Sequence, residues 1–266
     1  MNLTNKRILI TRPRAQAEEL ANALNAEGAQ PIFFPVIKII PPDYFSAFDF
    51  ALQSLEQFDW LILTSIHGVD AFFKRFEVLG IKWIPPHLCV AAVGSKTARR
   101  LSEYGVRTDY VPDEYIPETM LPGFGKNIYG KRFLFPQSNL ARTVLADRIR
   151  SAGGLVTEIV AYQTVINDPD HTEIDELLAG VDVVTFTSPS TVQNFVAIVQ
   201  KNGLDPLNLP GNPLFACIGP ITQKAAEEAG LGNLVTASEY TTDGLIEVIA
   251  NEGKFVNKET GIQVNT

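Results

Sequence analysis

The chain has 266 residues, of which 45% are hydrophobic and 20% charged, and 30 acidic against 22 basic side chains give a net charge of −8. This length is sufficient for two domains that each bury a core. The composition excludes disordered and fibrous classes. Because an acidic protein repels polyanions, we expect neither nucleic acid nor an anionic membrane as a partner.

Targeting and metal signals are missing from the sequence. Met1–Arg12 has too short an apolar run for a signal peptide, and no window has the roughly 18 apolar residues of a membrane span. We therefore expect a cytoplasmic protein. Cys89 and Cys217 belong to apolar runs, which predicts buried, reduced thiols. Three histidines are scattered and predict no metal site: His67, His87 and His171.

The first predicted elements are a strand at Ile8–Thr11 and a helix at Arg14–Glu27. The helix has one apolar stripe, at helical spacing: Ala17, Leu20, Ala21 and Leu24. Gly28 follows as the left-handed residue that often ends a helix. This helix is expected to pack on a sheet.

Later strands are predicted at Trp60–Leu63, Val90–Val93 and Val183–Phe186. They are almost continuously apolar, which is typical of parallel strands covered on both faces. Strands of this kind alternating with helices predict an α/β fold, built as an open, doubly wound parallel sheet with helices on both sides.

An internal repeat links the two halves of the chain. Three segments recur in the same order, 125, 123 and 125 positions later: Ile8–Thr11 with Phe133–Pro136, Phe58–Ser65 with Val181–Ser188, and Val90–Thr97 with Phe215–Thr222. Chance similarity explains one such pair but not the ordered series. We interpret the chain as an internal duplication that gives two parallel-sheet domains.

The turns after the predicted strands are short and rich in hydroxyl groups and glycine. Six of them share this character: Thr11–Arg14, Thr64–Gly68, Val93–Thr97, Pro136–Asn139, Thr187–Ser190 and Ile218–Thr222. Taken singly, Ser or Thr at such a position is most simply a helix N-cap. Their recurrence, with Arg14, Lys96, Arg142 and Lys224 close by, favours an anion-binding cleft between the domains.

Several chemistries find no support in these turns. No strand is followed by a P-loop or a G-x-G-x-x-G pattern, and no nucleophile elbow is present. Asp59 and Asp182 stand at the opposite edge and are interpreted as solvated turn residues, and His67 as a lone surface histidine. For Tyr162 two interpretations stay open, an aromatic side chain packing on a strand and a functional phenol.

These segments together resemble the uroporphyrinogen-III synthase family over roughly residues 7–250. The resemblance rests on an ordered set of short motifs: Ile10–Pro13, Leu63–Ser65, Val93–Gly94, Thr97–Ala98, Phe135–Pro136 with Asn139, Ala161–Thr164, Thr187–Ser190 and Ile218–Gly219–Pro220 with Thr222. Two residues depart from the family pattern, since Ile66 stands where a proline is common and Ser95 where Asn is frequent.

The resemblance implies two α/β domains joined by a two-stranded β connector. The first domain would comprise residues 1–37 and 167–266, and the second residues 39–165. Phe34–Ile40 would pair with Ile159–Ile166, and two thin connections would allow hinging. Residues 251–266 are polar and are expected to form a flexible tail.

The resemblance also implies a function. Members of the family are lyases of porphyrin and heme biosynthesis that cyclise linear hydroxymethylbilane to uroporphyrinogen III, with inversion of ring D and loss of water. No cofactor or metal is implied, the linear tetrapyrrole is the expected partner, and a monomer is expected. By resemblance Tyr162 is the catalytic candidate. The substrate-binding candidates are Arg12, Thr64, Ser65, Gly94, Thr97, Asn139, Ser188, Ser190, Gly219 and Thr222.

Two other functions are compatible with this sheet design. A two-domain ligand-binding or sensor protein would close on its ligand without transforming it. A nucleotide-sugar transferase is disfavoured, because the sequence has no recognisable nucleotide site.

Overall fold

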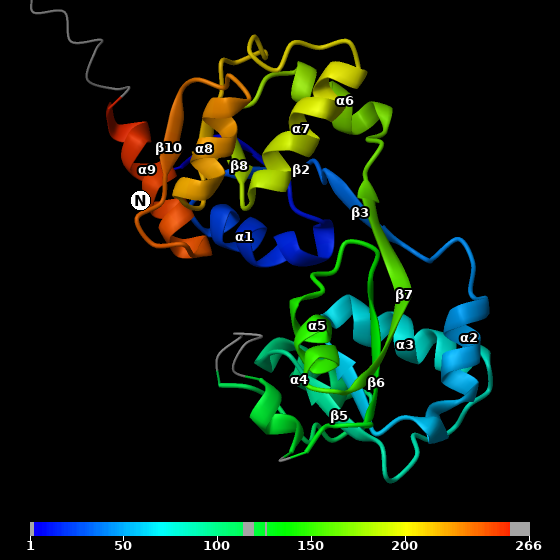
Figure 1. Ribbon diagram of the computed structural model, residues 1–266. Helices are drawn as coiled ribbons and strands as arrows, with labels where there is room; N and C mark the ends of the chain where they lie inside the picture. Colours follow the sequence, from blue (N-terminus) through cyan, green and yellow to red (C-terminus); the bar gives the residue numbers. More distant parts are fainter. Residues whose placement is uncertain (1–2, 114–119, 126, 256–266) are drawn as a thin grey trace, which may run out of the picture. The chain divides into compact units, whose positions relative to one another are not determined.

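The computed structural model describes residues 3–113, 120–125 and 127–255 (Figure 1). The chain divides into two compact units, which we call unit 1 (Met1–Lys38 and Ile166–Thr266) and unit 2 (Ile39–Val165). The chain therefore passes twice from one unit to the other. None of the helices within the described ranges is long and apolar enough to cross a membrane.

Unit 1 contains a five-stranded sheet in the order β10-β9-β8-β1-β2. Its strands are β1 (Arg7–Ile10), β2 (Gln30–Phe33), β8 (Val183–Phe186), β9 (Leu214–Cys217) and β10 (Leu234–Thr236). All neighbouring pairs are parallel. The predicted parallel α/β character is confirmed, and β8 has the predicted bounds.

Helices cover both faces of this sheet. They are α1 (Arg14–Ala26), α6 (His171–Leu178), α7 (Pro189–Lys201), α8 (Pro220–Glu228) and α9 (Thr242–Phe255). Residues of β1 alternate between the two faces: Leu9 packs with Phe195 of α7, whereas Ile8 and Ile10 pack with Leu24 of α1 and Leu245 of α9. Two apolar layers therefore enclose the sheet.

Unit 2 contains the second five-stranded sheet, in the order β3-β7-β6-β4-β5. Its strands are β3 (Ile37–Ile40), β4 (Trp60–Leu63), β5 (Cys89–Ala92), β6 (Arg132–Ser138) and β7 (Leu155–Ile166). The pairs β4/β5, β4/β6 and β6/β7 are parallel. The first two residues of β3 and the last residue of β7 belong to unit 1.

Within the described residues of unit 2, four α-helices and two 3-10 turns surround this sheet. They are α2 (Ser46–Gln53), η1 (Leu55–Gln57), α3 (Ile66–Val78), α4 (Ser95–Glu103), η3 (Leu121–Phe124) and α5 (Val144–Ser151). Phe72 of α3 and Leu101 of α4 lie in one core cluster, while Phe124 and Ile149 lie in another with Phe133. Unit 2 therefore has its own core on each face.

Several boundaries predicted from the sequence were placed slightly wrongly, and β1 and β5 each begin and end one residue earlier than predicted. The first helix ends at Ala26, and Gly28 follows with the predicted left-handed φ of 82°. Phe34 is not paired as predicted, because its N–H donates to the carbonyl of Ile10 at 2.9 Å in unit 1, and β3 begins only at Ile37. The predicted tail begins too early, because α9 continues to Phe255. Residues 256–266 lie outside the described residues.

The two cysteines have different surroundings. Cys217 is fully buried, as predicted, and burial raises the pKa of its thiol to about 12. Cys89 opens the edge strand β5 and is only half-buried, so the prediction of a buried thiol was wrong there. Both are free thiols.

The two aspartates at the amino edge of the sheets are partly exposed, and they also have a structural role that their interpretation from the sequence as solvated turn residues did not include. The Asp182 carboxylate accepts the Arg7 N–H and the Lys6 ammonium, each at 2.8 Å. Asp59 accepts the Arg132 N–H at 2.7 Å. Each carboxylate thus satisfies the first N–H group of the neighbouring parallel strand, which would otherwise lack a partner.

Candidate functional site

In unit 1, predicted site residues gather at the carboxyl edge of the sheet, where the strands end. Arg12 follows β1, Ser188 follows β8 and Gly219 follows β9, and these three strands are neighbours. Ser190 and Thr222 lie in the first turns of α7 and α8. Because the strands are parallel, the sequence-distant turns share one edge.

Ser188 and Thr222 differ in their surroundings. Ser188 caps α7 by accepting the Thr191 N–H at 3.3 Å, and its hydroxyl oxygen lies 3.0 Å from that of Ser190. Thr222 is 3% exposed. The N-cap interpretation is therefore correct for Ser188. The hydroxyl groups of Ser188 and Ser190 both lie at the N-terminus of α7, and helix N-termini favour anions.

Unit 2 repeats this arrangement at the carboxyl ends of β6, β4 and β5. Thr64 and Ser65 follow β4, Gly94 and Thr97 follow β5, and Asn139 follows β6. Asn139 also has a structural role, because its side-chain oxygen accepts the Thr164 N–H of β7 at 2.8 Å.

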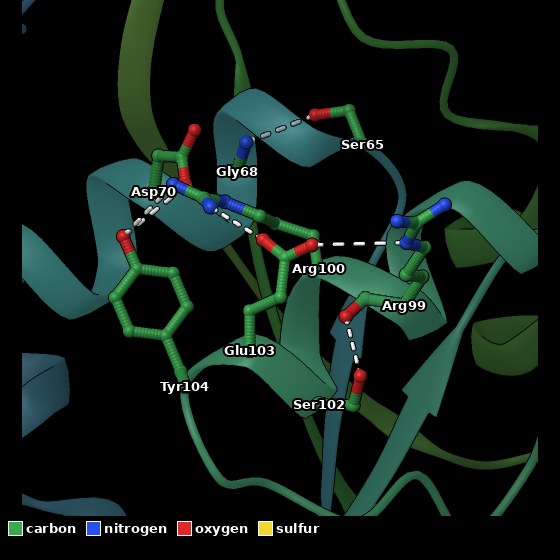
Figure 2. Close-up of polar contacts among 8 residues, drawn as sticks. All are labelled: Ser65, Gly68, Asp70, Arg99, Arg100, Ser102, Glu103 and Tyr104. Atoms are coloured by element: carbon green, nitrogen blue, oxygen red, sulfur yellow. Dashed lines mark hydrogen bonds and ion pairs between the residues drawn. The ribbon is translucent and has the colours of Figure 1, made fainter.

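Tyr162 of β7 is joined to this edge through Ser65. The two hydroxyl oxygens lie 2.9 Å apart, and Tyr162 is 8% exposed. Ser65 is also the N-cap of α3 and accepts the Gly68 N–H at 3.0 Å, as Figure 2 shows. Whichever hydroxyl donates to the other, the second hydroxyl hydrogen of the pair is not used in this bond. The pair can therefore donate a proton or hydrogen bond to a ligand.

Tyr162 borders a polar cavity of about 440 Å³. Its other walls include Thr64, Ser138, Arg142 and Thr164. These groups offer hydroxyl donors and one guanidinium to a ligand beside the phenol. Such a set suits carboxylates, which accept several hydrogen bonds.

The chain matches the family model described as uroporphyrinogen-III synthase HemD over residues 18–247. The chain belongs to the uroporphyrinogen-III synthase family. The uroporphyrinogen-III synthase of Synechococcus elongatus is 35% identical over 252 residues, which cover 93% of this chain and 95% of that protein. The chloroplastic uroporphyrinogen-III synthase of Oryza sativa is 24% identical, covering 91% of this chain and 79% of that protein.

Solved structures of the uroporphyrinogen-III synthase family share the fold. The enzyme from Helicobacter pylori matches with a TM-score of 0.61 at 15% identity, covering 93% of this chain and 99% of that one. A mutant enzyme from Thermus thermophilus matches with a TM-score of 0.58 at 20% identity, covering 94% and 99%. At these identities the likeness concerns the fold.

Sequence reasoning missed two features of the site in this member of the uroporphyrinogen-III synthase family. Ser138 was not singled out because β6 extends to it, beyond the predicted strand, with a register shift between Gln137 and Ser138 that single-sequence patterns do not reveal. His67 is no lone surface residue, since its half-buried ring meets the Tyr162 ring edge to face at 5.8 Å.

A polar network ties the two helices that carry these turns. Arg100 of α4 donates to Asp70 of α3 at 2.5 Å and to Glu103 at 2.6 Å, and the Tyr104 hydroxyl donates to Asp70 at 3.2 Å (Figure 2). Hydrogen bonds to Glu103 and Asp70 raise the pKa of Arg100. The network fixes α3 against α4, and with them the turns that begin at Ser65 and Gly94.

We expect His67 to make stability depend on pH. Burial lowers the pKa of His67 below 6.5, although the charge of Asp70 opposes the change. The unfolded chain then binds the proton first as the pH falls below about 6.5, so the free energy of unfolding decreases until the folded pKa is passed. Urea unfolding at pH 7.5 and 5.0 measures this loss, which should be smaller in His67→Gln. An equal loss in both proteins would contradict the assignment.

Proposed function

We propose that this chain cyclises hydroxymethylbilane to uroporphyrinogen III, with inversion of ring D and loss of water. Membership of the family supports the reaction. The structural observation that carries the proposal is the 2.9 Å contact between Tyr162 and Ser65 beside a polar cavity. A phenol in this position can donate to a departing hydroxyl group.

The chemistry demands little from the protein beyond positioning. The hydroxymethyl hydroxyl leaves as water after receiving a proton, and the pyrrole nitrogen supplies electrons, which gives an azafulvene. The substituted carbon of ring D attacks it, and the spiro intermediate fragments and recloses. Tyr162 assists the departure of water, and the rest of the site holds the chain folded so that head-to-tail closure to the type I isomer is avoided.

We further propose that the turns in each unit bind substrate carboxylates. The substrate carries eight of them, and the N-terminal N–H groups of α3, α4, α7 and α8 stand at the carboxyl edges with Ser, Thr and Gly beside them. Helix N-termini and hydroxyls bind anions without a basic surface. This agrees with a net charge of −8.

The proposed duplication and the two-domain division have independent support in the topology. The strand order β9-β8-β1-β2 in unit 1 corresponds, strand by strand, to the order β5-β4-β6-β7 in unit 2. Asp182 of unit 1 and Asp59 of unit 2 accept N–H groups from equivalent strands. We propose that β3 and β7, which are neighbours in one sheet, form the connector. We also propose a cytoplasmic monomer that needs no cofactor.

The deciding experiment incubates the protein with freshly generated hydroxymethylbilane, without added metal or nucleotide, and separates the type I and type III products. We expect mainly the type III isomer. A ligand-binding or sensor protein would leave only the type I isomer, formed without catalysis, and that result would overturn the proposal.

Thr222 provides a comparison of two threonines within unit 1. We expect Thr222→Ala to lower turnover more than Thr4→Ala, because only Thr222 lies at a helix start on the carboxyl edge. A loss of one hydrogen bond to a charged group predicts roughly a tenfold effect on kcat/KM. Steady-state kinetics measure it, with thermal unfolding as the control for folding. Equal activities would remove Thr222 from the proposed site.

A further inference from the structure

A groove of about 350 Å³ runs along α3 in unit 2, and Tyr162 is one of the residues that line it. Six residues of α3 line it at helical spacing: His67, Asp70, Ala71, Lys74, Arg75 and Val78. Ile39–Pro42 and Phe45 also line it. The groove is separate from the polar cavity described above, but Tyr162 borders both.

Most of the charge in this groove is already compensated. Arg75 makes two hydrogen bonds of 2.6 Å to the carboxylate of Asp49, and its guanidinium carbon lies 4.1 Å from the centre of the Phe45 ring. Asp70 is bound by Arg100. Because Arg75 and Asp70 are each paired with an opposite charge, these two side chains leave little net charge in the groove to attract a ligand.

Lys74 is different. Its side chain is exposed, and within the described residues no carboxylate forms an ion pair with it. The groove thus combines largely apolar walls with one available cation. A flat aromatic ring that bears a carboxylate is complementary to this combination, because the ring covers apolar surface while the carboxylate meets the ammonium group.

We propose that the groove along α3 holds a terminal pyrrole ring of the linear tetrapyrrole, with a carboxylate of that ring bound by Lys74. The assignment rests on the proposed function, and it adds a substrate-binding residue that the strand-end turns do not contain. The groove meets the site at Tyr162, so a ring bound in it keeps the reacting end of the substrate near the phenol. The side chains of Pro41, Pro42 and Phe45 provide the apolar surface against which the ring packs.

Kinetics with hydroxymethylbilane test the role of Lys74. We expect KM to rise about threefold in Lys74→Ala and about tenfold in Lys74→Glu, since an exposed ion pair contributes modestly and a carboxylate at this position repels the ligand. The kcat should stay within about twofold, because the interaction is the same in ground and transition states. Lys74→Arg should restore KM.

The matched control is Lys82→Glu, which makes the same charge change at an exposed lysine outside the groove. Its KM should stay near that of the wild type. The difference between wild type and Lys74→Glu should shrink at about 1 M salt, where the Debye length is about 3 Å. A purely structural role of Lys74 would not respond to salt in this way. Equal KM values for Lys74→Glu and Lys82→Glu would overturn the proposal.

A binding experiment separates this inference from the proposed reaction. A monopyrrole with one acetate and one propionate group is titrated into ¹⁵N-labelled protein, and the amide signals of Ala71, Lys74 and Val78 are followed. We expect shifts at these amides in wild type and in Lys82→Glu, and a weaker affinity in Lys74→Glu. Absent shifts, or equal affinities, would overturn the groove assignment. Shifts without formation of type III product would retain the groove and refute the proposed function.

Discussion

Replacing Tyr162 by Phe is expected to lower kcat by about 10²-fold, the lower end of the range for a proton donor in general acid catalysis. The ring and its packing against His67 are retained, and only the hydroxyl beside Ser65 is lost. The effect stays at the lower end because the pyrrole nitrogen of the substrate itself expels the hydroxyl group. Single-turnover measurement of type III product reports the chemical step.

Binding and folding distinguish this role from a structural one. Product affinity should be largely retained in Tyr162→Phe, as for an interaction made chiefly in the transition state. The free energy of unfolding should fall by no more than about 1.5 kcal/mol, the typical contribution of one hydrogen bond. Wild-type kcat in a folded variant would exclude Tyr162 from the chemistry.

Ser65→Ala provides the companion test. It removes the partner of Tyr162 and also the N-cap of α3, which contributes about 1 kcal/mol. Asp170→Ala is the matched control, since it removes the N-cap of α6, and Asp170 is not among the proposed site residues. If Ser65 orients the phenol, kcat falls only in Ser65→Ala. A similar kcat in the two variants would reduce Ser65 to a helix cap.

The parallel α/β architecture could be predicted from the sequence because its signals are local. The apolar run of β8 and the helical stripe of α1, which ends before Gly28, need no tertiary context to be recognised. The recurrence of Thr-Ser at Thr64 and Thr187 after buried strands pointed to the carboxyl edge. Parallel pairing then brings such turns together, and the structure confirms that both sets lie at strand ends.

The details of the site depend on contacts that local patterns do not encode. His67 meets Tyr162 only because β7 and the start of α3 come together through the sheet order. Asp59 resembled a solvated turn residue, but the neighbouring strand that it binds begins 73 positions later in the chain. Phe34 was assigned to the connector by the family resemblance, whereas its backbone N–H donates to the carbonyl of Ile10 in unit 1. In each case the surroundings of the residue depend on a contact with a residue that is distant in the sequence.

Phe195→Ala is expected to destabilise unit 1 by about 3–5 kcal/mol, the usual cost of removing a buried phenylalanine ring. Phe195 is fully buried in α7 and meets Phe34 and Phe186 edge to face, at 5.9 and 5.5 Å. Its loss leaves a cavity in a core cluster whose described members belong to unit 1. Unfolding followed by amide hydrogen exchange locates the effect.

Exchange should accelerate in β8 and β9 while amides of β4 and β6 keep their protection, because each unit has its own apolar clusters. Phe72→Ala is the matched control: Phe72 is fully buried in α3 and stacks on Phe76 at 5.7 Å in unit 2. It should give the opposite pattern. If either variant instead accelerates exchange equally in both sheets, the two units unfold as one cooperative body. That result would contradict the proposal that the two units are separately stable domains.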